Sequence, residues 1–264
     1  MRRPDELLAN CFVDHPDDID LEVIAFQEGL EVRDDALDGC EASLVGYGSK
    51  GVIKVAPGVS PERRRFSIAH EVGHWERHRG QSFSCRVEER ALDKAVRSKE
   101  READDYAAEL MMPPNLFKEA IRSIKTRVSL GLISDLGKTF RASFPAAAIR
   151  YAELSGEPVV LVFSGVGTNR RWSSRSKRVP EHLWLAGHLD SDSFASDLRA
   201  AAPDTKRQGK MPAEVWFDGI QEDKYELEEF SLRAYEGVYT LLYLSDEGLL
   251  RERMSAKRNW REEE

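Results

Sequence analysis

The feature that most constrains this chain is a His-Glu-x-x-His motif formed by His70, Glu71 and His74. Residues four apart lie one turn above each other on one face of an α-helix, so two imidazoles at this spacing can reach one cation. Glu71 lies one residue further around the helix, close enough to act on a water at that cation without binding the cation itself. The motif therefore predicts a helix that carries a Zn²⁺ site of the kind found in zinc peptidases.

Signals for the start of a helix stand before the motif. Ser60 is a capping residue, Pro61 suits the first helical position, and Glu62 places an acid in the first turn. Apolar residues recur at helical spacing and are expected to be buried: Ile68, Val72 and Trp75. The two histidines then fall on the opposite side, where the alternative to a metal site is a helix face that contacts only water.

His78 lies on the same face as the two motif histidines. Eight residues along a helix span roughly 12 Å, and one ion with ligand bonds of about 2 Å cannot bridge that length. A broken helix of the metzincin type would need Gly at position 77 and His at position 80, where this chain has Arg77 and Gly80. We therefore expect His78 to be a surface residue and not a ligand.

A third ligand must come from another segment. Residues 88–112 form a long helical pattern without Gly or Pro, and within it Glu100 and Asp104 stand one turn apart. Glu100 is the expected third ligand. Asp104 would accept the far N–H of a ligand histidine and so fix its tautomer. Pro113, after the last residue of this pattern, marks its end.

Two alternatives stay open for this acidic segment. Glu102 competes with Glu100 for the third ligand position, although only Glu100 has Asp104 one turn on. The whole segment could equally form a solvated charged face, since it is acidic throughout. Ala103 and Ala107 favour the ligand interpretation, because small side chains would let this helix approach the histidine helix closely.

Composition limits the class of protein. The chain has 264 residues, a formal net charge of -8 and 41% hydrophobic residues, which is enough for a sizeable core and disfavours direct DNA binding. Three scattered cysteines imply no disulfide framework. The longest apolar run, Val159 to Phe163, is too short to cross a bilayer, and the first residues lack a signal-peptide pattern. We expect a soluble, cytoplasmic protein with no membrane partner.

The pattern along the chain predicts an α+β fold in two parts. Residues 1–155 are expected to form a mainly helical metallopeptidase domain with a small sheet, which ends in a segment of helix-turn-helix cadence. Its sheet is a hairpin over residues 43–55, whose edge is a candidate surface for strand addition by a peptide. Residues 156–250 are expected to form a smaller α+β domain, for which a regulatory role is one interpretation. Residues 251–264 are expected to form a charged tail.

The second part is expected to contain mainly strands. Residues 159–163 read as a buried strand that returns near Trp172, and further strands are expected at 214–218, 226–235 and 238–244. Residues 191–200 are expected to form a short helix. No metal cluster or phosphate loop is visible in the sequence of this part.

Two separate blocks resemble the ImmA/IrrE metallopeptidase family. The first is Arg65-Phe66-Ser67-Ile68-Ala69-His70-Glu71-Val72-Gly73-His74, and the second is Glu100-x-x-x-Asp104-x-Tyr106-Ala107-Ala108-Glu109-Leu110-Met111-Met112-Pro113. The resemblance covers roughly residues 1–155. It implies a gluzincin-like site with His70, His74 and Glu100 as Zn²⁺ ligands and Glu71 as the base.

The same resemblance implies a proteolytic regulator. It predicts a zinc-dependent endopeptidase that cleaves a helix-turn-helix repressor and so controls a stress-response or mobile-element regulon. The alternatives are a metal-stabilised regulator that binds a repressor or DNA without cleavage, and a toxin–antitoxin partner. Tyr106 and His78 are weak candidates for stabilising the oxyanion, and Tyr106 is expected to pack in the core instead.

Overall fold

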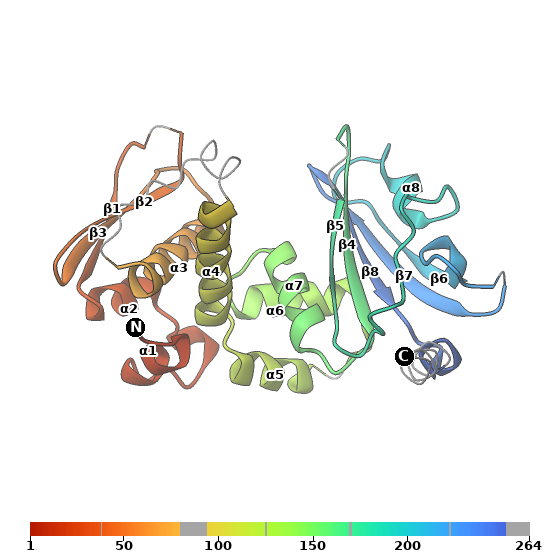
Figure 1. The fold of residues 1–264 in the computed structure, drawn as a ribbon, viewed down its shortest axis with the longest axis horizontal. Coiled ribbons are helices and arrows are strands. Elements are labelled where there is room, and N and C mark those ends of the chain that lie inside the picture. Colours follow the sequence, from red (N-terminus) through yellow and green to blue (C-terminus); the bar gives the residue numbers. More distant parts are fainter. Residues whose placement is uncertain (38, 80–93, 125, 169–170, 222, 252–264) are drawn as a thin grey trace. The chain divides into compact units, whose positions relative to one another are not determined.

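The computed structural model describes residues 1–37, 39–79, 94–124, 126–168, 171–221 and 223–251. The chain divides into two compact units, drawn in Figure 1: Met1–Ser123 with Asp135–Ala146, and Ile124–Ser134 with Ala147–Glu264. Both units combine helices with a sheet, so the expected α+β class is confirmed. The domain boundary expected at residue 155 stays a prediction, which the folding of separate fragments would test.

The first unit begins with short helices. They are α1 (Pro4–Asn10), the 3₁₀ turn η1 (Pro16–Asp18) and α2 (Leu21–Gln27). The side chain of Asp20 caps α2 by accepting hydrogen bonds from the backbone N–H groups of Glu22 and Val23. Ile19 and Ile24 are buried. Val23 and Phe26 are apolar too, yet they are 49% and 73% exposed.

A three-stranded sheet follows, in the order β1-β3-β2. The expected hairpin is confirmed as β2 (Ala42–Tyr47) and β3 (Lys50–Val55), joined by a tight turn in which Gly48 has a φ of +61°. Strand β1 (Leu30–Asp34) pairs in parallel with β3, and the sequence pattern did not predict a strand at these residues. A parallel pair leaves no local turn signal, since its partners are far apart in the chain.

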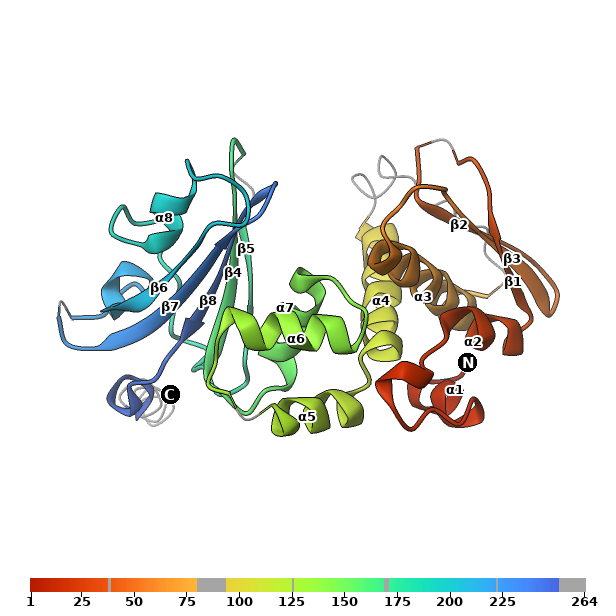
Figure 2. The ribbon, with the colours of Figure 1, turned by 180° about the vertical axis from the view of Figure 1, so that it is seen from behind.

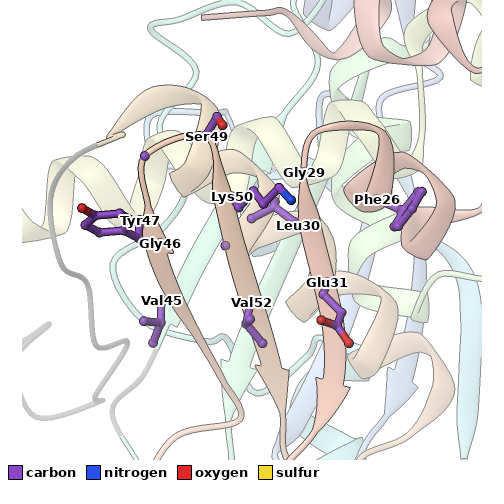
Figure 3. A pocket seen from close by; sticks show the side chains of 12 residues that line it. Phe26, Gly29, Leu30, Glu31, Val45, Gly46, Tyr47, Ser49, Lys50 and Val52 are labelled. Atoms are coloured by element: carbon purple, nitrogen blue, oxygen red, sulfur yellow. The ribbon is translucent and has the colours of Figure 1, made fainter.

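The two faces of this sheet differ. Ile53 and Val55 are fully buried on the inner face, whereas Val45 and Tyr47 on the outer face are largely exposed. The outer face, with Phe26 beside it, lines a hollow of about 900 Å³ (Figure 3). The histidine helix packs on the other side, where the rings of Trp75 fill the space beside the strand glycines.

Helices α3 (Pro61–Arg77) and α4 (Lys94–Met111) pack side by side at the centre of this unit (Figures 1 and 2). The expected start of α3 is confirmed, since Ser60 Oγ accepts a hydrogen bond from the backbone N–H of Arg63 at 3.2 Å. Gly73 sets the closeness of the two helices: a Cβ there would lie 3.1 Å from the carbonyl oxygen of Ala103. The part of the expected second helix before residue 94 lies outside the described residues.

Three helices follow α4, namely α5 (Pro114–Ser123), α6 (Leu130–Thr139) and α7 (Phe144–Leu154). The break between α6 and α7 contains Arg141, which has a φ of +50°. Residues 131–134 lie inside α6, although a glycine at position 131 would favour a break there. Leu132 and Ile133 are buried, so packing outweighs the low helix propensity of Gly131.

The second unit contains an antiparallel five-stranded sheet in the order β5-β4-β8-β7-β6. Three expected strands are confirmed: β4 (Val159–Gly165), β7 (Glu226–Arg233) and β8 (Gly237–Tyr243). The expected return near Trp172 is β5 (Arg171–Arg175), and the expected short helix is α8 (Phe194–Leu198).

Two assignments in this unit are corrected by the structure. Residues 214–218 were expected to form a strand, but a 3₁₀ turn, η3 (Ala213–Val215), starts there and only Phe217 makes an isolated bridge, to Leu185. Strand β6 (Lys206–Pro212) was missed, because its exposed edge position leaves its residues mostly polar. The expected tail from residue 252 onward lies outside the described residues.

No helix in the described part of the chain combines the length and the apolar character that crossing a bilayer requires.

Candidate metal centre

The motif histidines lie where α3 is buried on all sides. His70 is 4% exposed, His74 is 1% exposed, and Glu71 between them is fully buried. The expected burial of Ile68, Val72 and Trp75 on the opposite stripe is confirmed. The alternative of a helix face that contacts only water is therefore wrong for these residues.

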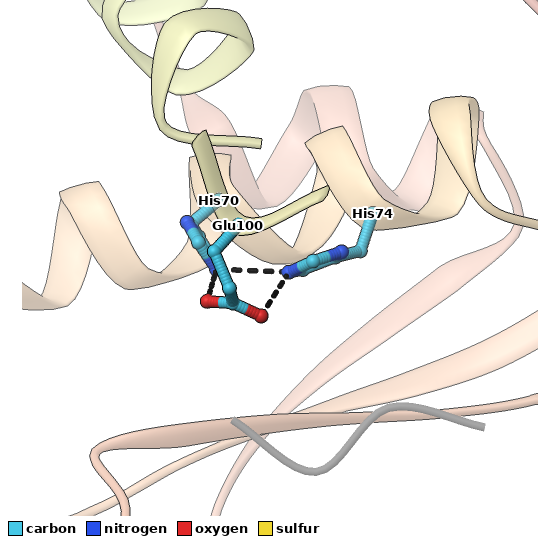
Figure 4. A group of neighbouring side chains, drawn as sticks. All are labelled: His70, His74 and Glu100. Atoms are coloured by element: carbon cyan, nitrogen blue, oxygen red, sulfur yellow. Dashed lines mark hydrogen bonds and ion pairs between the residues drawn. The ribbon is translucent and has the colours of Figure 1, made fainter. Parts of the chain in front are cut away.

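The structure brings His70, His74 and Glu100 together, as Figure 4 shows. The two histidine Nε2 atoms lie 3.0 Å apart. The carboxylate of Glu100, which projects from α4, places Oε2 at 3.4 Å from His70 Nε2 and Oε1 at 3.3 Å from His74 Nε2. Glu100 is only 8% exposed, so the solvated acidic face considered for its helix does not describe this residue.

These distances fit a single divalent cation. Ligand bonds of about 2.0–2.1 Å in a tetrahedral arrangement place the ligand atoms about 3.3–3.4 Å from one another. The two Nε2 atoms are 3.0 Å apart, and each lies 3.3–3.4 Å from one of the two oxygens of Glu100, so the separations are close to that value. Two imidazoles and one carboxylate are also a donor set found in catalytic zinc sites with one open position.

Asp104 fixes the tautomer of His70. Its Oδ1 lies 2.9 Å from His70 Nδ1, and a carboxylate can only accept, so Nδ1 carries the proton and donates it. The lone pair of His70 is thereby left on Nε2, the atom that faces His74 and Glu100. This is the contact that the one-turn spacing of Glu100 and Asp104 predicted, and it suits a metal ligand.

Glu102 does not join the cluster. Its Oε2 lies 3.4 Å from Nε2 of His78 instead. His78 was expected on the surface, and this is wrong, because the residue is 8% exposed and its Nδ1 lies 3.1 Å from His74 Nδ1. Burial is the largest cause that lowers the pKa of His78. The sequence could not show this burial, since it depends on how closely α4 covers the end of α3.

Tyr106 packs in the core, as expected. It is 2% exposed, and its O–H donates a hydrogen bond to the backbone carbonyl of Arg2 at 3.2 Å. Burial raises the pKa of this phenol well above its usual range. Its hydroxyl is therefore engaged away from the histidine cluster.

Known proteins resemble this chain in its fold and in one family pattern. A search of curated proteins found no match. Among solved structures, one described as a Mycobacterium tuberculosis transcriptional regulator has a similar fold, with a TM-score of 0.59 and 16% sequence identity over 90% of this chain and 85% of that chain. At that identity the likeness shows the fold alone.

A family model for the IrrE N-terminal-like domain (Peptidase_M78) matches residues 25–151. The matched range contains α3 and α4 and all the residues of the cluster. The expected resemblance to the ImmA/IrrE family of metallopeptidases is therefore confirmed over residues 25–151.

Proposed function

We propose that the chain is a zinc-dependent endopeptidase in which His70, His74 and Glu100 hold the metal and Glu71 is the general base. One observation carries this proposal: three ligand atoms from two helices lie within 4.8 Å of one another, and a buried Glu stands between the two histidines. The match of residues 25–151 to the Peptidase_M78 family model supports the peptidase chemistry. The donor set favours zinc over manganese, which prefers oxygen ligands.

Each residue has a distinct task in this mechanism. When bound, the metal would act as a Lewis acid toward the scissile carbonyl and lower the pKa of water in its open position. Glu71 would take a proton from the attacking water and deliver it to the leaving amide nitrogen. Asp104 would hold His70 in the tautomer that keeps its Nε2 lone pair directed at the metal.

The proposed substrate is a helix-turn-helix repressor that controls a stress-response or mobile-element regulon. A peptide cleaved at this site must lie extended, and β2 is an edge strand to which no other described strand pairs on its outer side. Strand addition along β2 would provide main-chain hydrogen bonds independent of the substrate sequence. The regulator-like fold of the solved neighbour agrees with a regulatory setting.

The test is cleavage of a repressor encoded beside this gene by the full-length, zinc-loaded protein. The expected result is new repressor fragments with the wild type and a rate about 10²–10⁴-fold lower with Glu71→Gln. Because Glu71 is not a proposed ligand, the variant should keep one equivalent of zinc. Undiminished cleavage by this variant would remove Glu71 from the mechanism.

The same experiment separates the peptidase from a regulator that only binds. Titration of the wild type with repressor, and separately with operator DNA, reports affinity by fluorescence anisotropy. Tight binding without fragments, in the presence of bound zinc, would replace the peptidase by a binding regulator or a toxin–antitoxin partner.

A further inference from the structure

A series of side-chain contacts continues from His74 beyond the cluster of His70, His74 and Glu100. His74 Nδ1 lies 3.1 Å from His78 Nδ1, and His78 Nε2 lies 3.4 Å from Oε2 of Glu102. The first two residues come from the end of α3 and the third from α4. All of the His78 side chain but 6% is buried, whereas the side chain of Glu102 is 55% exposed.

The end of α3 creates this arrangement. His78 is the C-cap residue, with φ -129° and ψ 27°, and its backbone N–H still donates to the carbonyl of His74 at 2.8 Å. Its side chain therefore stays one turn beyond His74, too far from His70 for both to bind one ion. It contacts the far nitrogen of the nearer histidine instead.

The direction of the hydrogen bond between His74 and His78 follows from the proposed role of His74 as a metal ligand. A ligand imidazole that offers the Nε2 lone pair carries its proton on Nδ1, and that proton needs an acceptor. The neutral imidazole of His78 accepts at Nδ1 only if its own proton is on Nε2. The carboxylate of Glu102 lies 3.4 Å from that Nε2 and so places a negative charge beside the N–H, which favours this tautomer of His78.

We propose that His78 and Glu102 are positioning residues that hold His74 in its metal-binding tautomer and orientation. They do for His74 what Asp104 does for His70, except that an imidazole is interposed between ligand and carboxylate. The inference rests on the proposed metal site and adds to it a role for two residues outside the ligand set. It also gives Glu102 a function distinct from that of a rival ligand.

The test measures zinc affinity of the full-length protein by competition with a chromophoric chelator. Loss of an outer hydrogen-bond partner typically weakens metal binding about 10–100-fold, and this range is expected for His78→Ala. Glu102→Gln is expected to weaken binding less, because the acceptor is partly exposed. The matched control is Asp105→Asn, which removes the same charge from an exposed position of α4 and should leave the affinity unchanged.

Two further measurements separate positioning from folding. The d–d absorption of the Co²⁺-loaded protein reports ligand geometry, and it should change in His78→Ala and Glu102→Gln but not in Asp105→Asn. The double variant should lose no more affinity than His78→Ala alone, because Glu102 acts through His78. If His78→Ala does not fold, the comparison of Glu102→Gln with Asp105→Asn in zinc affinity and Co²⁺ spectrum still tests the positioning role.

The outcomes distinguish this inference from the proposed function. A wild type that binds no zinc would remove the metal site itself. A wild type that binds zinc, with unchanged affinity and Co²⁺ spectrum in both variants, would overturn the positioning role alone. Equal losses in Glu102→Gln and Asp105→Asn would assign the effect to overall charge and would also overturn it.

Discussion

Three acids of α4 illustrate how much one helical position matters. Glu100 reaches both Nε2 atoms of the cluster, Asp104 contacts His70 Nδ1, and Glu102 contacts His78. Glu100 and Asp104 share a face because they are one turn apart, while Glu102 projects elsewhere. The same residue type thus has different proposed roles within one and a half turns of helix.

Glu100→Gln is predicted to lose zinc. The change keeps the shape of the side chain but removes the negative charge and one of the oxygens that face the histidines. We expect affinity to fall by more than the roughly 100-fold typical of an outer partner, as measured by isothermal titration calorimetry. Glu109→Gln, at an exposed position of the same helix, is the control. Equal zinc affinity in the two variants would exclude Glu100 as a ligand.

The second unit has its own buried acid, Glu229. It is fully buried, and its oxygens accept hydrogen bonds from Trp216 Nε1 at 2.8 Å, from the backbone N–H of Ala195 at 2.7 Å and from Ser231 Oγ at 2.6 Å. Burial raises the pKa of this carboxyl, and the hydrogen bonds only partly oppose the shift. The charged form is therefore costly in the folded protein.

This pKa shift predicts a pH dependence of stability. A carboxyl with a raised folded pKa contributes stability that is fully present below its unfolded pKa and is lost as pH rises through the folded value. The Glu229→Gln variant should lose this pH dependence. The N–H₂ group of its new amide has no suitable acceptor there, and we expect this to lower the free energy of unfolding by about 1–3 kcal/mol. Urea unfolding from pH 4 to pH 8 measures both effects. Glu236→Gln, at an exposed turn, is the control and should show the same pH dependence of stability as the wild type. If stability varies with pH as steeply in Glu229→Gln as in the wild type, the prediction is contradicted.

At the scale of elements, the site depends on the close approach of α3 and α4. Neither helix holds all the proposed ligands, so the distance between their axes sets the distance between Glu100 and the histidines. Gly73 permits the approach, because its face lies against the backbone of Ala103 and the side chain of Tyr106. The Gly within the motif therefore has a packing role separate from the chemistry of its neighbours.

Gly73→Ala is predicted to destabilise the protein. A methyl group there would lie 3.1 Å from the carbonyl oxygen of Ala103 and 3.2 Å from Tyr106 Cβ. Overpacking costs about 1–3 kcal/mol and should exceed the roughly 1 kcal/mol that Ala gains in helix propensity. Urea unfolding measures the net change. Gly131→Ala in α6 is the control, since its Cβ would meet only Ser129 Oγ, at 3.6 Å. If Gly73→Ala raises the free energy of unfolding more than Gly131→Ala does, the packing role of Gly73 is refuted.

At the scale of the whole molecule, the proposed metal site belongs to one of two units. All its residues lie within Met1–Ser123, so metal binding should stabilise that unit directly. A ligand present at 100 times its dissociation constant adds about 2.7 kcal/mol to the stability of the state that binds it.

Zinc is therefore predicted to slow hydrogen exchange in α3 and α4. The measurement is amide hydrogen exchange by mass spectrometry, with zinc and with a chelator in its place. Amides of β7 and β8 in the second unit report whether the effect is local. His70→Ala should abolish the protection. Identical exchange of α3 and α4 under both conditions at saturating zinc would count against a metal bridge between these helices.

The sequence by itself determined the local parts of this protein. The cap at Ser60 and the four-residue spacing of the histidines placed two imidazoles on one helix face. The turn at Gly48 defined the hairpin, and the run of buried residues in β4 defined a strand. These features are encoded by neighbouring residues, because capping, turn geometry and helical periodicity act over a few positions.

Only the tertiary structure decided which distant groups meet. It placed Glu100 at the histidines and Glu102 on His78, it buried His78, and it left Phe26 exposed. It also paired β1 with β3 in parallel. Each of these outcomes depends on the packing of segments tens of residues apart, and no periodicity within either segment records the distance between them.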